Sequence, residues 1–343
     1  MNLDQIDIRN INLNKSNEKF EVEGFLKKFD LILEKDVDYT IALYDEDRII
    51  GTGSLSGNVL KCIAVDSNYQ GFGLTNRLIT VLLNEQYDRG NSHLFIFTNP
   101  SNKKFFFDTG FYEIAEIDSK VTLLENDPMG IEKYINRLFL SRKDGNVISS
   151  IVMNCNPFTY GHQYLIENAS RNSDVVHLFV VWEDKSIFPN EVRFNLIKSG
   201  ISHLENVILH KGSDYIISNS TFPSYFIKEK NSIVNVHAQL DLKIFGTYIA
   251  PPLGINRRYI GEEPFDLVTN EYNSVMKNLL PNYDIEVIEI PRKALGGQII
   301  SASRVRAAIK EGKISILEDM VPSTTFDYLI SDDAKPIIDK IIG

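Results

Sequence analysis

The sequence has few cysteines and no long apolar run, and both shortages narrow the class of protein. Only two cysteines occur among 343 residues, Cys62 and Cys155, and each lies in or beside an apolar segment typical of a strand. Because free cysteine is among the most buried residue types, we expect two buried thiols without a disulfide, as in a reducing compartment. No apolar stretch approaches bilayer length, and the amino terminus lacks a basic region followed by an apolar one. We therefore expect a cytoplasmic protein that does not bind a membrane.

Positive charge is also in short supply. Lys and Arg number 36 against 46 Asp and Glu, which gives a formal net charge of -10. A general nucleic-acid binder needs clustered Lys and Arg to displace counterions from phosphates, so this balance argues against that class. Any anion site must therefore be local. With 43% hydrophobic and 24% charged residues, the composition is that of a globular protein.

The length predicts two domains, because 343 residues exceed what one hydrophobic core usually supports. Residues 1–130 alternate short apolar runs with helix-like stretches, which indicates an α/β or α+β domain. Residues 131–146 combine an amphipathic piece with a polar cluster, and we place a linker there. Residues 147–343 form the second predicted domain.

In the second domain, near-continuous apolar runs alternate with segments of helical period, a pattern typical of parallel strands buried on both faces. The predicted strands are 147–153, 175–182, 207–210, 258–261 and 285–290, and the predicted helices are 163–170, 191–204, 266–280 and 303–310. Strand and helix in alternation imply right-handed crossovers and a doubly wound parallel sheet. Ligands of such sheets bind beyond the carboxyl ends of the strands.

The first of these strands is followed by Asn154-Cys-Asn-Pro-Phe-Thr-Tyr-Gly-His162 and then by a helix. A tight turn into a helix is an anion site, because unpaired N–H groups and about half a positive charge lie at the helix N-terminus. Thr159 and His162 would lie at its mouth. Gly161 would let the backbone approach a phosphate, and Pro157 would stiffen the turn. We expect Asn154, Asn156, Pro157, Phe158 and Gly161 to contribute to nucleotide binding.

A second turn, Ile300-Ser-Ala-Ser-Arg-Val-Arg306, follows the last parallel strand and also opens a helix. Ser303 is the expected N-cap, and its hydroxyl together with that of Ser301 can donate to phosphate oxygens. Arg304 and Arg306 add positive charge. Two helix N-termini, a histidine, hydroxyls and an arginine pair suit a triphosphate if the two turns meet at one crevice.

The two turns together resemble the paired signatures of the adenylyl- and cytidylyltransferase superfamily. Those signatures are His/Thr-x-Gly-His, matched by residues 159–162, and Ile-Ser-Ser-Thr-x-x-Arg, matched by residues 300–306. Ala302 and Ser303 replace Ser and Thr in the second signature, and the second replacement keeps a hydroxyl. The resemblance implies that His162 stabilises the leaving side of the α-phosphate and that Thr159 binds a phosphate oxygen.

The same resemblance assigns two cations to the phosphates. Lys185, just after the second strand, matches the lysine that superfamily members use on phosphates, and Arg306 would hold the β- and γ-phosphates. Arg193 is an alternative to Lys185, and the choice of Arg306 over Arg304 depends on the motif register alone. Mg²⁺ should accompany ATP, held by phosphate oxygens and waters with few protein ligands, and no dedicated metal cage is visible.

Segments between the motifs resemble the citrate lyase ligase family of citrate-fermenting bacteria, and this likeness extends over the chain. It is carried by residues 151–167, 179–189, 215–218, 221–226, 249–255 and 259–265. The resemblance implies that acetate attacks the α-phosphate of ATP, giving acetyl-adenylate and pyrophosphate. A thiol on the acyl carrier (γ) subunit of citrate lyase then takes the acetyl group and releases AMP. No motif marks a pocket for a monocarboxylate.

In the first domain, residues 63–75 followed by a helix resemble the pyrophosphate loop of GNAT N-acetyltransferases, Gln/Arg-x-x-Gly-x-Gly/Ala. Gln70 and Gly73 match, Gly71 lies between them, and Thr75 replaces the last small residue. Residues 99–111 also resemble that fold's closing segment. The carrier's prosthetic arm is similar to coenzyme A, so the loop either grips this arm or is an inherited scaffold.

Three classes of function stay open on the motifs. The first is the acetate-activating ligase, the second a nucleotidyltransferase that makes a dinucleotide or coenzyme precursor, and the third a protein that senses or docks through its acetyltransferase-like fold. ATP–pyrophosphate exchange separates them. Acetate dependence supports the first class, dependence on a mononucleotide or phosphopantetheine supports the second, and no exchange with any acceptor supports the third.

Overall fold

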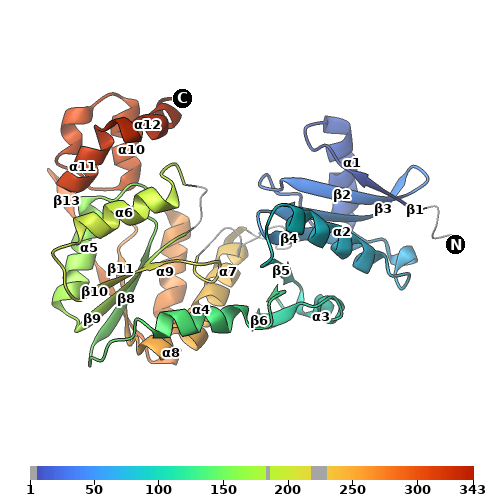
Figure 1. The fold of residues 1–343 in the computed structure, drawn as a ribbon, viewed down its shortest axis with the longest axis horizontal. Coiled ribbons are helices and arrows are strands. Elements are labelled where there is room, and N and C mark those ends of the chain that lie inside the picture. Colours follow the sequence, from blue (N-terminus) through green and yellow to red (C-terminus); the bar gives the residue numbers. More distant parts are fainter. Residues whose placement is uncertain (1–5, 183–185, 218–229) are drawn as a thin grey trace. The chain divides into compact units, whose positions relative to one another are not determined.

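The computed structural model describes residues 6–182, 186–217 and 230–343 (Figure 1). By its contacts the chain divides into two compact units. One consists of residues 1–133 and 219–240, and the other of residues 134–218 and 241–343. Among the described residues, no helix combines the length and apolar character needed to span a membrane.

The first unit is built on a seven-stranded sheet of order β1-β2-β3-β4-β5-β7-β6. Its strands are β1 (Ile6–Asn10), β2 (Tyr39–Asp45), β3 (Arg48–Ser56), β4 (Val59–Val65), β5 (Phe95–Thr98), β6 (Tyr112–Ile117) and β7 (Val121–Glu125). Its helices include α1 (Ser16–Leu26), α2 (Leu74–Asp88) and α3 (Lys103–Phe107). All neighbouring strands are antiparallel except β4 and β5.

Helices α1 and α2 cover opposite faces of this sheet, and the period of two along β2 explains why. Ile41 and Leu43 belong to the apolar cluster that contains the buried face of α2. Ala42 and Tyr44, one residue out of step, belong to the cluster formed with α1. Since successive strand residues point to opposite faces, one apolar strand serves both layers.

Strands β4 and β5 are paired in parallel only at their first residues. Val59 pairs with Phe95 and Leu60 with Ile96, whereas no further pair of residues joins the two strands. Strand β4 continues beyond this point in pairing with β3 as far as Val65. The two strands therefore part before the turn that leads into α2.

The second unit contains a five-stranded, wholly parallel sheet of order β10-β9-β8-β11-β12. Its strands are β8 (Ile148–Met153), β9 (Val175–Val180), β10 (Val207–Lys211), β11 (Arg257–Gly261) and β12 (Glu286–Ile290). Strand order runs outward from β8 in one direction and from β11 in the other, which makes the gap between their carboxyl ends the topological switch point. The predicted doubly wound parallel sheet is confirmed.

Helices of this unit lie on both faces of the sheet (Figure 1). They are α4 (Gly130–Phe139), α5 (Tyr160–Arg171), α6 (Asn190–Gly200), α8 (Ala250–Leu253), α9 (Leu267–Leu279), α10 (Ala302–Lys310), α11 (Ser323–Leu329) and α12 (Lys335–Ile342), while α7 (Lys230–Ile244) belongs to the first unit as far as Leu240. Helices α4 and α7 each begin in the first unit as the contacts divide the chain. A π-helical turn, Phe245–Ile249, joins α7 to α8.

Alternation along β9 again assigns the two layers. Val176, Leu178 and Val180 share an apolar cluster with α5 and α6. On the other face, the Phe179 ring meets Phe245 of the π-helical turn edge to face, with ring centroids 6.3 Å apart. Helices α10 and α12 pack against each other in a separate apolar cluster, and α12 was not predicted.

Candidate functional site

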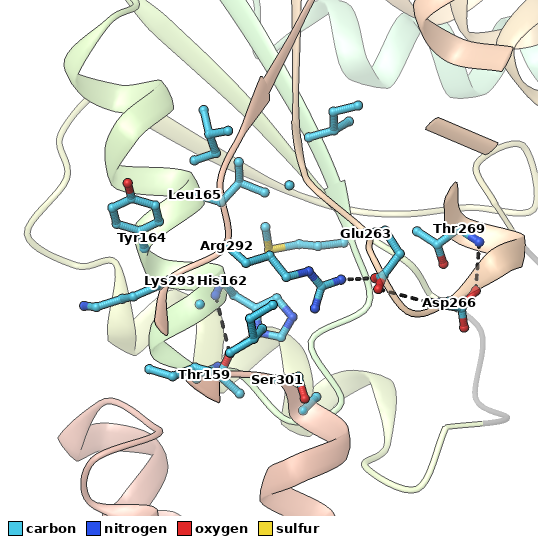
Figure 2. Close-up of a pocket in the computed structure, with 18 of the residues that line it drawn as sticks. Thr159, His162, Tyr164, Leu165, Glu263, Asp266, Thr269, Arg292, Lys293 and Ser301 are labelled. Atoms are coloured by element: carbon cyan, nitrogen blue, oxygen red, sulfur yellow. Dashed lines mark hydrogen bonds and ion pairs between the residues drawn. The ribbon is translucent and has the colours of Figure 1, made fainter. Parts of the chain in front are cut away.

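A cavity of about 1060 Å³ lies in the second unit at the switch point between β8 and β11. Val152 and Met153 line it from β8, and Tyr259 and Ile260 line it from β11. The turn after β8 and the turn before α10 both line this same cavity (Figure 2). The volume is at the upper end of the roughly 300 to 1,000 Å³ that ligand pockets occupy, so it offers space for a nucleotide and a small second ligand.

The structure gathers most of the expected site residues around this cavity. Those that line it are Asn154, Thr159, Gly161, His162, Ser301, Ser303 and Arg304. Asn156, Pro157, Phe158 and Arg306 are not among the lining residues. Lys185 lies outside the described residues.

Thr159 and His162 form a reciprocal cap at the start of α5. The Thr159 backbone N–H donates to Nδ1 of His162 at 3.1 Å, and the His162 backbone N–H donates to Thr159 Oγ1 at 3.4 Å. Nδ1 therefore carries a lone pair, and the proton of the neutral ring is on Nε2. Burial, followed by the positive charge of Arg292, lowers the pKa of His162 to about 4. The imidazole is neutral at pH 7 and presents one N–H donor.

Gly161 is explained by the second turn. A Cβ at position 161 would come within 2.9 Å of the carbonyl oxygen of Ile300, closer than real Cβ atoms approach backbone. Only a glycine lets the start of α5 lie against the residue that precedes α10. The sequence predicted close approach to a phosphate at this position, whereas the neighbour in the structure is the other turn.

The N-cap of α10 is Ser301, not the predicted Ser303. Ser301 Oγ accepts the backbone N–H of Arg304 at 3.3 Å, and the helix begins at Ala302. A serine in extended conformation caps a helix by bonding the N–H three residues on, and Ser301 is the serine that satisfies this spacing. Ser303 is left exposed on the first turn of the helix.

The two arginines of α10 have different neighbours. Arg304 lines the cavity and donates to the Ile299 carbonyl and the Gln298 side chain. Arg306 donates from Nη1 to the Asn156 carbonyl and from Nη2 to Ser303 Oγ at 3.2 Å. Arg306 thus ties the first turn to the second.

Arg193 anchors the first turn from beneath. Its side chain is fully buried in α6 and donates to the carbonyls of Phe188, Asn154 and Val181 at 2.7 to 3.0 Å. It also donates to the Asn154 side-chain oxygen at 2.7 Å. The alternative that Arg193 reaches the phosphates is wrong, because these bonds turn its guanidinium into the protein core.

Three expected nucleotide contacts lie behind the cavity wall. Phe158 is fully buried in the apolar cluster between the sheet and helices α5 and α6. Asn156 Oδ1 accepts the Phe188 backbone N–H at 3.0 Å, and its carbonyl accepts Arg306. Pro157 is buried beside them. These residues hold the shape of the turn instead of lining its open side.

Two cations in the cavity lining were missed by the sequence analysis. Arg292 and Lys293 follow the carboxyl end of β12 directly and both line the cavity (Figure 2). Arg292 pairs with Glu263, and the Lys293 ammonium lies 5.0 Å from the centre of the Tyr160 ring. The rule that ligands bind beyond strand ends could have found them, since β12 was correctly predicted to end at Ile290.

In the first unit, the expected pyrophosphate loop is an open turn between β4 and α2. Gln70, Gly71 and Gly73 are exposed, and Thr75 lies in the first turn of α2. Both glycines have positive φ, 84° and 74°, and a Cβ on either would meet nothing within 4 Å. The glycines are thus required by backbone conformation and leave the loop's outer side uncovered.

No group of three or more His, Cys, Asp and Glu that could hold a metal ion occurs in the described ranges.

Two family models match the chain. The model described as the citrate lyase ligase C-terminal domain matches residues 148–329. The model described as an acetyltransferase (GNAT) domain matches residues 16–132. A protein named [citrate [pro-3S]-lyase] ligase from Klebsiella pneumoniae is 41% identical over 313 residues, with 90% of this chain and 92% of the relative covered. The chain belongs to the citrate lyase ligase family.

Further members of this family show similar likeness. The Haemophilus influenzae protein of the same name is 43% identical, with 90% of this chain and 94% of the relative covered. The Escherichia coli K12 protein of that name is 39% identical, with 90% and 89% covered. The predicted family and the enzyme class of ligase are confirmed by these relatives.

Solved structures match about a third of the chain. Escherichia coli ElaA is 10% identical, with 36% of this chain and 99% of that chain covered and a TM-score of 0.32. A GNAT-family acetyltransferase from Staphylococcus aureus is 17% identical, with 35% and 97% covered and a TM-score of 0.30. The predicted α/β fold class, with a GNAT-like first domain, is confirmed by the family model that matches residues 16–132.

Proposed function

We propose that this chain activates acetate with ATP and transfers the acetyl group to a thiol on the acyl carrier subunit of citrate lyase. One observation carries the proposal: two helix-opening turns about 140 residues apart, Asn154–His162 and Ile300–Arg306, line one cavity. Membership of the citrate lyase ligase family supplies the reaction class. The proposal adds to this reaction class the acetyl-adenylate intermediate, the acyl carrier as acetyl acceptor and ATP as the nucleotide.

The cavity suits the phosphates of ATP. The N-termini of α5 and α10 both open on it, and each offers backbone N–H groups and a positive dipole end. Arg258, Arg292, Lys293 and Arg304 add cationic charge to the lining, which outnumbers the carboxylates of Asp266 and of Glu263, the partner of Arg292. In a protein of net charge -10, this is the local concentration of positive charge that a polyanion requires.

In the first step, an oxygen of acetate forms a bond to the α-phosphorus while the bond from that phosphorus to the bridging oxygen breaks. Pyrophosphate leaves with the electron pair. His162 donates its Nε2 proton in a hydrogen bond to the α-phosphate and stays neutral, since Nδ1 is engaged by Thr159. Ser301 and Ser303 offer hydroxyls, and Arg304 offers charge, to the departing phosphates.

In this proposal Arg306 chiefly holds the two turns in place. It holds Asn156 and Ser303, so the two turns keep their spacing as charge moves from the α- to the β-phosphate. Such fixed placement matters in phosphoryl-type chemistry, where catalysis is mostly positioning and charge stabilisation. Mg²⁺ would arrive with ATP and be held by phosphate oxygens and waters. We retain Lys185 as a further phosphate ligand.

In the second step, the carrier thiol attacks the acetyl carbonyl carbon, a C–S bond forms, and AMP leaves as the C–O bond to its phosphate breaks. The thiol proton passes to solvent. We propose that residues 1–130 form the domain that grips the coenzyme A-like arm through Gln70, Gly71, Gly73 and Thr75. The open glycine loop and the parting of β4 from β5 support this role. Residues 147–343 would form the adenylating domain, with 131–146 as linker.

Acetate-dependent ATP–pyrophosphate exchange tests the proposal. Radiolabelled pyrophosphate should enter ATP when acetate is present and the carrier is absent, because the first step is reversible. Omitting acetate should abolish the exchange. Exchange that requires a mononucleotide or phosphopantetheine instead of acetate would assign the chain to coenzyme-precursor synthesis.

A further inference from the structure

The cavity contains an arginine that the proposed phosphate chemistry does not use. Arg258 of β11 lines the cavity and is only 2% exposed. Its Nε and Nη1 are buried without a hydrogen-bond partner in the part of the chain that the structure describes. A buried guanidinium normally has its N–H donors satisfied, because an unpaired buried charge is costly. The feature indicates a missing acceptor.

The neighbouring carboxylate does not provide that acceptor. Asp241 of α7 is buried nearby, but its Oδ1 accepts the Ile217 backbone N–H at 3.0 Å and its Oδ2 accepts the Tyr272 hydroxyl. Among the described residues, no carboxylate oxygen lies within 4.0 Å of Arg258. The Arg258 guanidinium instead lies 4.6 Å from the centre of the Phe245 ring. Asp241 acts as a distant countercharge, while Nε and Nη1 of Arg258 have no hydrogen-bond acceptor among the described residues.

Arg258 lies deeper than the groups assigned to the phosphates. It is three residues before Gly261, the last residue of β11, which places its Cα about 10 Å before the strand's end. The turns and cations assigned to ATP follow strand ends or open helices. A small anion reaches the Arg258 position more readily than a triphosphate does.

The wall that α9 contributes to the cavity combines neutral polar with apolar side chains. One face of α9 lines the cavity with Thr269, Tyr272, Asn273 and Met276, spaced as one helical stripe. Met276 is 2% exposed, and Ile217 also lines the cavity. A small acid with a short apolar tail suits this arrangement, because the guanidinium binds carboxylate oxygen while Met276 and Ile217 can contact a methyl group.

We propose that Arg258 is the carboxylate anchor of a second subsite in the cavity, where a short monocarboxylate, acetate in the proposed function, accepts from its unpartnered N–H donors. One oxygen of the anchored carboxylate is thereby directed toward the α-phosphate bound at the mouth. This inference extends the proposed function by assigning the position of the acid.

Substitution of Arg258 by methionine is the direct test, with Arg258→Lys as the conservative variant. We expect the acetate KM in ATP–pyrophosphate exchange to rise about a hundredfold in Arg258→Met, since a buried charge-assisted pair is lost. The kcat at saturating acetate and the affinity for a nonhydrolysable ATP analogue should stay near wild type. Arg258→Lys should give a smaller rise, because it keeps the charge but not the fork.

Arg257→Met is the matched control. Arg257 precedes Arg258 on the same strand and makes an ion pair with Glu286, 2.8 Å away at the surface. Its loss should leave the acetate KM unchanged. Arg258→Met also leaves the buried Asp241 without its distant countercharge, so the melting temperature is measured beside the acetate KM. A marked fall in melting temperature together with an unchanged acetate KM would assign Arg258 to the fold and overturn the subsite.

Binding of ¹³C-labelled acetate, followed by NMR line broadening with the ATP analogue present, separates this inference from the proposed function. Broadening in wild type and in Arg257→Met that disappears in Arg258→Met supports the subsite, even if exchange is absent and the proposed reaction fails. Equal broadening in wild type and in Arg258→Met overturns the subsite, even if acetate-dependent exchange is found. Absence of broadening in wild type also overturns it.

Discussion

Two helix-opening turns of this protein, one before α5 and one before α2, differ in how firmly they are held. The turn from Asn154 to His162 is bonded from within by the Thr159–His162 cap and from outside by Arg193 and Arg306. The turn that leads into α2 is bonded within Asp66–Gln70, as by the Tyr69 N–H that donates to the Asp66 carbonyl at 2.8 Å, whereas Gly71, Phe72 and Gly73 are exposed. Its N-cap residue, Gly73, offers no side chain at all.

This difference corresponds to two kinds of task. A turn that stabilises a transition state must already hold its donors in place, because reorganisation during reaction adds to the barrier. A turn that receives a long flexible arm needs accessible backbone and room for approach, which positive-φ glycines provide. The first description fits the proposed adenylating site, and the second fits the proposed capture of the carrier's prosthetic group.

Removal of the donor in the held turn should have the largest effect. We expect His162→Ala to lower the exchange rate by about 100- to 1,000-fold, the usual cost of losing one preorganised donor. Circular dichroism should show an intact fold. His203→Ala is the control, since His203 is exposed on the same unit, with Nε2 3.3 Å from Glu167. Equal rates in wild type and His162→Ala would remove His162 from the chemistry.

Each turn is bonded by an arginine, Arg193 in the first case and Arg48 in the second, and replacing each arginine compares how much it contributes to the free energy of unfolding. Arg193→Met leaves several buried oxygen atoms without donors, and we expect it to cost about 3 kcal/mol or more in free energy of unfolding. Arg48→Met removes the pair between the exposed Arg48 guanidinium and the buried Asp66, 2.8 Å apart at the start of the open turn, while Asp66 keeps the Asn68 backbone N–H as a donor. It should cost under about 1 kcal/mol. Urea unfolding measures both, and similar costs would contradict the difference between the turns.

The sequence predicted the framework of the second unit because its signals are local. The five parallel strands were placed to within a few residues, since a buried strand is a continuous apolar run. The helix cap at Ser301 was misplaced by two residues, because two serines of equal propensity stand in the same turn. What decides between them is the backbone of Ile300, which lies against Gly161.

Which cations line the site was harder to predict, because this also depends on tertiary contacts. The sequence shows that Arg193, Arg258, Arg292 and Arg306 are charged, but not which of them is turned toward the cavity. Arg193 was considered for phosphate binding and is buried under the turn, whereas Arg292 was overlooked and lines the cavity. The direction in which a long arginine side chain points depends on its tertiary neighbours, and the local sequence does not reveal it.

A substitution in the open turn should leave the first step, acetate activation, unchanged and should impair the second step, transfer of the acetyl group to the carrier. Gly73 has φ 74°, so Gly73→Val strains the loop and covers its outer side. We expect the KM for the carrier to rise about tenfold, on the order of 1.4 kcal/mol, while acetate-dependent exchange stays unchanged. Gly57→Val is a matched control with φ 55° at the β3–β4 turn, where an added Cβ also meets nothing within 4 Å. An unchanged carrier KM in Gly73→Val would remove the gripping role.

The smallest effect concerns pH. Because the folded pKa of His162 is about 4, below its usual 6.5, the unfolded chain binds more protons, and stability from this group decreases as pH falls from 6.5 toward 4. The ring stays neutral above pH 6. We therefore expect kcat/KM for ATP to change less than about twofold through His162 between pH 8 and pH 6. A fall centred near pH 6.5 that disappears in His162→Asn would show that the ring is not held neutral.

The central claim is that acetate oxygen becomes bonded to the α-phosphorus in the cavity between the two turns. Turnover with ¹⁸O-labelled acetate, ATP and the carrier tests it most directly by mass spectrometry of the products. The account predicts one ¹⁸O atom in AMP and none in pyrophosphate, because the acetate oxygen stays with the phosphate when the thiol takes the acetyl group. Unlabelled AMP, or label in pyrophosphate, would contradict it.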